Sequence, residues 1–184
     1  MDARTMVDHA PKKVAATTER KSDRELVFAR TVNGPGRLVF EAWTKPELLK
    51  RWWAPKSLGL TILSWDADVR VGGAYRIVMR HPSLEQPMAF FGKYLEVTPP
   101  ARLVWTNEES ADRAVSTVTF EEQGGKTRVV LLELYPSKEA LDAAIASGSS
   151  AMGEPSSSGM GEQFDQLDEL LVSLGGKSRD RTKS

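Results

Sequence analysis

The sequence predicts an α+β fold in which an antiparallel sheet of about seven strands wraps around a long C-terminal helix, with two short helices after the first strand. Between residues 60 and 134, apolar and polar residues alternate in short runs, which is typical of half-buried strands in an antiparallel meander. Two short stretches of helical spacing precede this region, over residues 36–44 and 46–54. One apolar stripe at helical spacing follows it, formed by Met160, Phe164, Leu167, Leu171 and Leu174.

The first strand is expected at residues 25–32, and Gly34-Pro35 ends it. Leu38, Val39, Ala42 and Trp43 then recur at helical spacing, which gives the helix over 36–44. Pro46 opens the second helix and Pro55 stops it, and its inward residues are Leu48, Leu49, Trp52 and Trp53.

From residue 60 the period changes from helical spacing to two. One face of the strand that begins there carries Leu63, Trp65, Ala67 and Val69, and Gly72-Gly73 supplies a hairpin turn. Further strands are expected at residues 75–80, 88–97, 103–106, 115–121 and 127–134. Gly92 interrupts one of them and indicates a bulge or a close backbone approach.

The ends of the chain are polar and lack periodicity, so residues 1–22 and 176–184 are expected to be disordered. Residues 23–175 are expected to form a single domain. Within it, the Gly- and Ser-rich residues 147–159 have a composition unsuited to a helix, and we expect a flexible insertion before the C-terminal helix.

Composition excludes several functions. The chain has no cysteine and two histidines, His9 and His81, which form no metal-site or nucleophile–base spacing, so we expect no metal and no cofactor. The net charge is zero with basic residues at both ends, so the central part is net negative and a nucleic-acid partner is not expected. No apolar run reaches the length of a membrane span, and residues 1–5 lack a signal-peptide pattern, which predicts a cytoplasmic protein.

Five segments carry a family resemblance: Ala42-Trp43-Thr44 with Pro46-Glu47, Trp52-Trp53-Ala54-Pro55, residues 68–73, Gly92–Val97 with Pro99-Pro100, and Ser137-Lys138-Glu139. Over about residues 24–174 the chain resembles the helix-grip fold of the START-like (SRPBCC) superfamily. Within it, the chain is similar to the family named after the C-terminal domain of activators of the ninety-kilodalton heat-shock chaperone. Members commonly carry the last helix with little interruption, and the 147–159 segment departs from that pattern.

The resemblance implies a hollow fold, and we expect a small apolar molecule to bind between the sheet and the C-terminal helix rather than catalysis. The expected lining residues are Trp53, Trp65, Tyr75, Ile77, Phe90, Trp105, Phe120 and Phe164. A second hypothesis is co-activation of a chaperone, or interaction with another protein. A third is a cyclase- or hydrolase-type enzyme that uses a cavity carboxylate.

Glu133 is the candidate for that carboxylate, working with Tyr75 or His81. It follows Thr127, Val129 and Leu131 at period two. Either the strand ends there and Glu133 reaches solvent, or Glu133 is a buried carboxylate in the cavity.

Overall fold

The computed structural model describes residues 15–109, 113–147 and 159–180 of the chain. An eight-stranded antiparallel sheet has the strand order β1-β2-β8-β7-β6-β5-β4-β3. Its strands are β1 (Thr17–Arg20), β2 (Glu25–Val32), β3 (Thr61–Ala67), β4 (Ala74–Arg80), β5 (Met88–Thr98), β6 (Arg102–Thr106), β7 (Val115–Gln123) and β8 (Lys126–Leu134). The α-helices are α1 (Gly36–Thr44), α2 (Pro46–Leu49), α3 (Lys138–Ser147) and α4 (Gly159–Asp180), and Lys56–Leu58 forms a 3-10 turn, η1.

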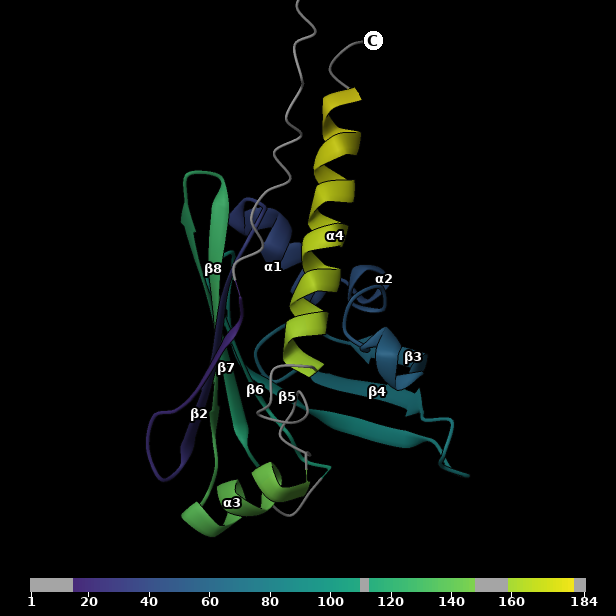
Figure 1. Cartoon of the computed structure of the whole chain (residues 1–184), viewed down its shortest axis with the longest axis vertical. Coiled ribbons are helices and arrows are strands. Elements are labelled where there is room, and N and C mark those ends of the chain that lie inside the picture. The colour runs from purple at the N-terminus through teal and green to yellow at the C-terminus, as the bar shows by residue number, and fades with distance from the viewer. Residues whose placement is uncertain (1–14, 110–112, 148–158, 181–184) are drawn as a thin grey trace, which may run out of the picture.

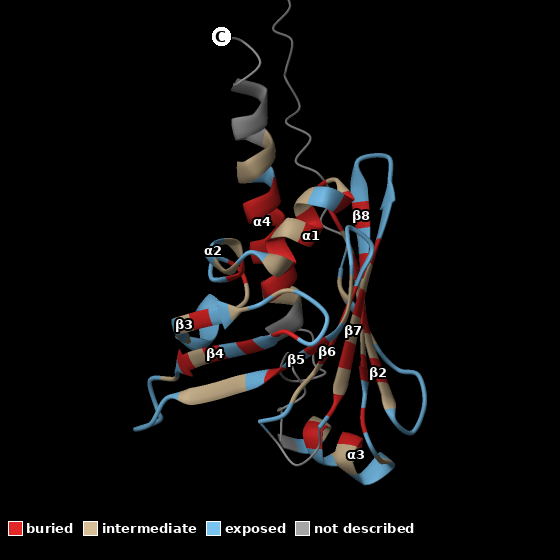
Figure 2. Cartoon of the chain, turned by 180° about the vertical axis from the view of Figure 1, so that it is seen from behind, coloured by how far each residue is buried: buried red, intermediate tan, exposed pale blue. Residues whose placement is uncertain are grey.

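The sheet bends strongly, and α4 lies lengthwise over its concave side (Figure 1). Strands β2, β7 and β8 stand on one side of this helix, and β3 and β4 project on the other. The buried residues of α4 cluster on the part that lies against the sheet and α1 (Figure 2). The predicted α+β helix-grip fold, with two short helices before the meander, is confirmed.

Three details differ from the expectations. Thr17–Arg20 forms strand β1 on the edge beside β2, within the segment expected to be disordered. Helix α4 continues to Asp180, past the expected end of the ordered chain, and α2 stops at Leu49. Most of the expected insertion, residues 148–158, lies outside the described residues.

Leu63 was expected on the apolar face of its strand, but its side chain is 44% exposed. The pairing of β3 with β4 shifts register between Ile62 and Ser64. Leu63 is the extra residue of this bulge, so it has no partner on β4. A bulge interrupts the alternation of side chains between the two faces of the strand. Trp65 is therefore buried while Leu63 faces solvent.

Arg30 joins the sheet to α4. It lies on the buried face of β2 with Leu26, Phe28 and Val32, and its side chain is only 3% exposed. One guanidinium nitrogen donates to Asp165 at 2.6 Å and to Asp168 at 3.1 Å, and a second donates to the carbonyl of Gly161 at 3.2 Å. The second oxygen of Asp168 accepts the backbone N–H of Asn33 at 2.7 Å. This ion-pair network fixes the start of α4 over β2.

Candidate ligand-binding site

Seven aromatic side chains meet where α1, the segment after α2 and the concave face of the sheet come together. We call this group the aromatic cluster: Phe40, Trp43, Trp52, Trp53, Trp65, Trp105 and Phe120. Trp43 is its hub, with ring centroids 4.9–6.2 Å from those of Trp52, Trp53, Trp105 and Phe120. Trp53 continues the contacts to Trp65, 5.5 Å away. The cluster therefore joins α1 and the segment after α2 to the sheet.

Four of the eight expected lining residues, Trp53, Trp65, Trp105 and Phe120, belong to this cluster. The other four pack in or against the same apolar core. Tyr75 and Ile77 are buried on β4, Phe90 pairs with Ile77 from β5 and is half-buried, and Phe164 of α4 is fully buried. Whether any of them contacts a ligand stays a prediction.

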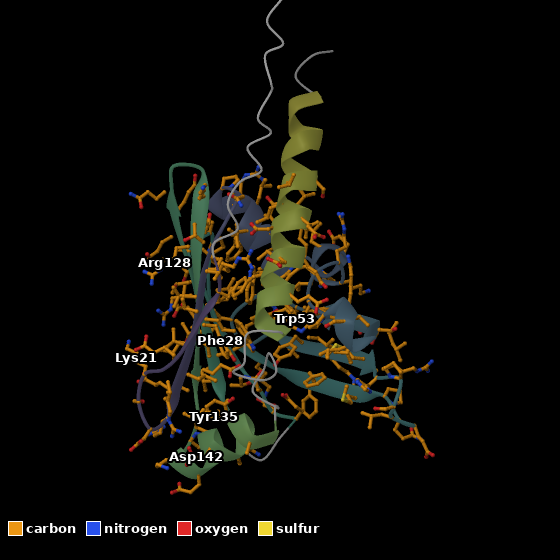
Figure 3. All side chains as sticks on the ribbon, viewed as in Figure 1. Lys21, Phe28, Trp53, Arg128, Tyr135 and Asp142 are labelled. Carbon is orange, nitrogen blue, oxygen red and sulfur yellow. The ribbon has the colours of Figure 1, made fainter. Side chains whose placement is uncertain are left out.

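Three polar side chains at the start of α4 hold the segment that carries Trp52 and Trp53. Gln166 donates to the carbonyls of Trp52 at 2.8 Å and Ala54 at 2.9 Å, and its oxygen accepts the N–H of Lys56 at 3.0 Å. Gln163 donates to the backbone carbonyl of Trp53. The side chain of Trp53 lies beside the N-terminal part of α4 (Figure 3).

The third is Glu162. It accepts the backbone N–H of Ser57 at 2.9 Å and also the hydroxyl of the same residue. Because an irregular loop cannot pair its own backbone groups as a helix or strand does, these bonds fix residues 52–57 as a lid.

The Glu162 contact predicts a weakening of the lid in acid. The hydroxyl of Ser57, more than any other group, holds the pKa of Glu162 below its usual value of 4.5. A carboxylate with a lowered pKa stabilises the folded state above its ordinary pKa, and this stabilisation is lost as the pH falls through the lowered value. We expect the tryptophan emission of the folded protein to shift between pH 5 and about pH 3, and Glu162→Gln to reduce the shift. The matched control is Glu169→Gln on the exposed face of α4. If both variants shift as the parent does, the contact does not hold the lid.

A cleft of about 530 Å³ opens beside the cluster. It is lined by Pro46 of α2 and by residues of β3, the following loop and β4: Trp65, Asp66, Ala67, Asp68, Ala74, Tyr75 and Arg76. Its volume lies within the roughly 300–1,000 Å³ typical of small-molecule sites. Trp65 is both a wall of this cleft and a member of the aromatic cluster, so it connects the solvent-open space with the interior. Asp68 pairs with Arg70 at 2.7 Å in the turn between β3 and β4.

A row of polar groups crosses the concave face away from the cluster. The hydroxyl of Tyr75 donates to the carbonyl of Thr106 at 2.9 Å and to the amide oxygen of Asn107 at 3.2 Å. Asn107 donates to the hydroxyl of Ser116 at 2.8 Å, and Ser116 lies opposite Glu133 in the pairing of β7 with β8. The row thus runs from the cleft wall to the candidate carboxylate.

Glu133 is fully buried, so the reading in which it reaches solvent is wrong. Strand β8 continues to Leu134, and period two therefore keeps Glu133 on the buried face. The hydroxyl of Tyr135 donates to Glu133 at 2.9 Å, near α3 (Figure 3).

The two expected partners of Glu133 lie at opposite ends of β4. Tyr75 is at its start, whereas His81 follows its last residue, about 20 Å away along an extended strand. His81 is bonded to Ser83 in the loop. Burial above all, with Glu109 nearby, raises the pKa of Tyr75, so its hydroxyl stays protonated at neutral pH. Burial also raises the pKa of the adjacent Tyr94 to about 12. The hydroxyl of Tyr75 is therefore a hydrogen-bond donor rather than a base.

The α4 residues that hold the lid, Glu162, Gln163 and Gln166, could not be identified from the sequence, because most of their partners are backbone groups that no side-chain pattern reveals. Arg30 had a usable signal, since it alternates with Phe28 and Val32 on the buried face of its strand. In the described ranges, no group of His, Asp and Glu is arranged to hold a metal ion, and no helix is both long and apolar enough to span a membrane.

Comparison with known proteins supports the fold and gives the family. The family model described as "Activator of Hsp90 ATPase homolog 1-like protein" matches residues 33–172. A crystal structure from Nitrosomonas europaea is 25% identical with a TM-score of 0.72, and the match covers 85% of this chain and 99% of that one. A Rhodobacter sphaeroides protein is 24% identical with a TM-score of 0.74 and 86% and 99% coverage.

A solution structure from Staphylococcus epidermidis is 26% identical with a TM-score of 0.66, and the match covers 86% of this chain and 94% of that one. The descriptions of these three structures state no ligand or activity. No curated protein matches the chain. Because the family model covers most of the sequence, the chain belongs to the Activator of Hsp90 ATPase homolog 1-like family, in the START-like (SRPBCC) superfamily.

Proposed function

We propose that this protein binds a small, largely apolar molecule between the sheet and α4. One observation carries the proposal: a cleft of about 530 Å³, lined by Pro46 and by residues of β3, β4 and their connecting turn, shares its wall, Trp65, with the aromatic cluster, whose Trp53 carbonyl accepts a hydrogen bond from Gln163 of α4. Apolar walls with a few fixed polar groups are the general pattern of small-molecule sites. Here the polar groups are the hydroxyl of Tyr75 and the charged residues Asp66 and Arg76 at the cleft.

The test is binding of a fluorescent apolar dye, 1-anilinonaphthalene-8-sulfonate, and of dodecanoate as a fatty-acid probe. We expect micromolar affinity, about 8 kcal/mol, and a change in tryptophan emission. Trp53→Leu should weaken binding at least tenfold, because it removes a ring that contacts both Trp43 and Trp65. Trp53 is only half-buried, so this variant is expected to fold.

The matched control is Leu95→Ala, an apolar side chain that is 50% exposed. It should bind both probes as the parent does. If neither dye nor fatty acid binds the folded parent, the cavity proposal fails. Interaction with a chaperone or another protein, which rests on the family description alone, would then take its place.

Burial of Glu133 supports the enzyme hypothesis as a second candidate function. A carboxylate among apolar residues is a group that enzymes use as an acid or base. A separate incubation tests it: an ester or polyketone probe should be recovered chemically changed from the parent and unchanged from Glu133→Gln. Recovery of unchanged probe from both proteins contradicts the enzyme hypothesis and leaves the binding proposal intact.

A further inference from the structure

Strand β3 is the last strand of the sheet, so one of its two edges pairs with no other strand in the described part of the chain. In an antiparallel pair, residues that bond to the partner strand alternate with residues whose N–H and C=O groups point away from it. Asp68 donates its N–H to the carbonyl of Ala74 at 2.9 Å, so Asp66, two residues earlier, also directs its backbone groups at β4. The N–H and C=O groups of Trp65 and Ala67 therefore point to the free edge.

The cleft beside the aromatic cluster lies at this edge. Helix α2 is next to β3 on the side away from β4 (Figure 1, Figure 2), and its Pro46 lines the same cleft as residues 65–68. Because the side chains of a strand alternate between its two faces, a cleft that touches four consecutive residues also touches their backbone. One side of the cleft is therefore an edge strand with unused backbone groups, and another side is a helix. An extended peptide binds to such an edge by adding a strand to the sheet.

Asp66 favours a basic occupant. It is exposed, lies opposite Arg76 in the register of β3 with β4, and forms no ion pair within 4 Å in the described ranges. The other carboxylate of the cleft, Asp68, is already paired with Arg70. A residue of an added strand would lie directly opposite Asp66 on the side away from Arg76, where a basic side chain completes a row of alternating charges. A second copy of β3 is less suitable, because pairing centred on Asp66 places two carboxylates opposite each other.

We propose that the free edge of β3 binds an extended segment of a partner protein, with a basic residue opposite Asp66 and an apolar residue on either side of it. The segment runs antiparallel to β3, as every strand pair of the sheet does, and exchanges backbone hydrogen bonds with Trp65 and Ala67. Its two apolar residues lie opposite Trp65 and Ala67, on the face of the sheet that carries the indole ring of Trp65. This inference goes beyond the proposed function, because it needs no molecule inside the fold.

The probe is the fluorescein-labelled, amidated peptide Ser-Val-Lys-Val-Ser. Fluorescence anisotropy with the full chain should give a Kd below about 1 mM. An ester oxygen in place of the N–H of the first valine adds no bulk but removes the donor to the carbonyl of Ala67, so binding should weaken about fivefold. The matched control is the same replacement at the lysine. Its N–H points away from β3, and the binding should stay unchanged.

Two protein variants test the same contacts from the side of β3. Ala67→Pro removes an N–H that makes no bond to β4, and proline is tolerated where the N–H of an edge strand faces outward, so the variant should fold and bind the peptide at least fivefold more weakly. Asp66→Asn gives a ratio that does not depend on stability. The parent should prefer the lysine peptide to Ser-Val-Gln-Val-Ser about threefold, and Asp66→Asn should lose this preference. The matched control, Glu85→Gln in the exposed loop after β4, should retain it.

Three outcomes overturn the inference. Equal weakening by the two ester replacements would mean that the peptide does not pair with β3. No anisotropy change up to about 1 mM protein would show that the edge does not take such a segment. A dimer of the parent in analytical ultracentrifugation that Ala67→Pro abolishes would show that a second copy occupies the edge instead. Each result leaves the small-molecule proposal standing, since dye and dodecanoate binding are measured separately, and failure of those two probes leaves the peptide site standing.

Discussion

Arg30→Met should destabilise the protein by about 3–5 kcal/mol, the cost of removing one partner from a buried ion pair. The guanidinium is the group that faces Asp165 and Asp168 from the sheet, and the side chain of Asp168 is only 10% exposed. Without Arg30, that carboxylate stays in a largely water-free place beneath α4. Urea unfolding should show a lower midpoint with an unchanged slope.

Two further variants test this explanation. Arg128→Met removes an arginine that points away from the core on the adjacent strand (Figure 3), and it should change stability by less than about 0.5 kcal/mol. Asp168→Asn added to Arg30→Met removes the stranded charge and keeps an oxygen for the N–H of Asn33, so it should restore part of the loss. If the double variant is less stable than Arg30→Met, the buried charge is not the cause.

Glycine and proline in the sequence located helix α1 well. Gly34-Pro35 and Pro46 bracket α1, and its bounds, Gly36–Thr44, agree with the predicted range. Proline and glycine act on the backbone itself, so their effect is readable without tertiary structure. Strand β1 was missed for the opposite reason. Thr17–Arg20 is polar and lacks alternation, and its strand exists through backbone bonds to β2.

The site could be predicted only in outline. Among the expected lining residues, Trp53 and Trp105 do contact Trp43, and Trp65 contacts Trp53. The hydrogen bonds that fix the lid could not be predicted, because Gln163 bonds to a carbonyl that every residue possesses. The sequence left two alternatives for Glu133, exposed or buried. Alternation at period two predicts the face on which a side chain lies, but it does not predict where the strand ends.

Gly92→Ala should lower the free energy of unfolding by about 3 kcal/mol or more, because the new methyl group would meet backbone rather than a movable side chain. A Cβ atom at Gly92 would lie 1.9 Å from the carbonyl oxygen of Thr106. That same oxygen accepts the hydroxyl of Tyr75 at 2.9 Å. Relieving the clash therefore displaces a residue of the proposed cleft as well as the paired strands.

Gly92→Ala should therefore reduce both the stability of the fold and ligand binding at the cleft. We expect a lower urea midpoint and, in the remaining folded protein, weaker binding of 1-anilinonaphthalene-8-sulfonate. The matched control is Gly161→Ala in α4, where an added Cβ has no atom within 4 Å outside the local helix and chain neighbours. Alanine favours a helix over glycine by up to about 1 kcal/mol, so the control should be equally stable or more stable. A Gly92→Ala protein within about 0.5 kcal/mol of the parent would show that β5 and β6 can separate here without loss, and that Tyr75 does not depend on this close approach.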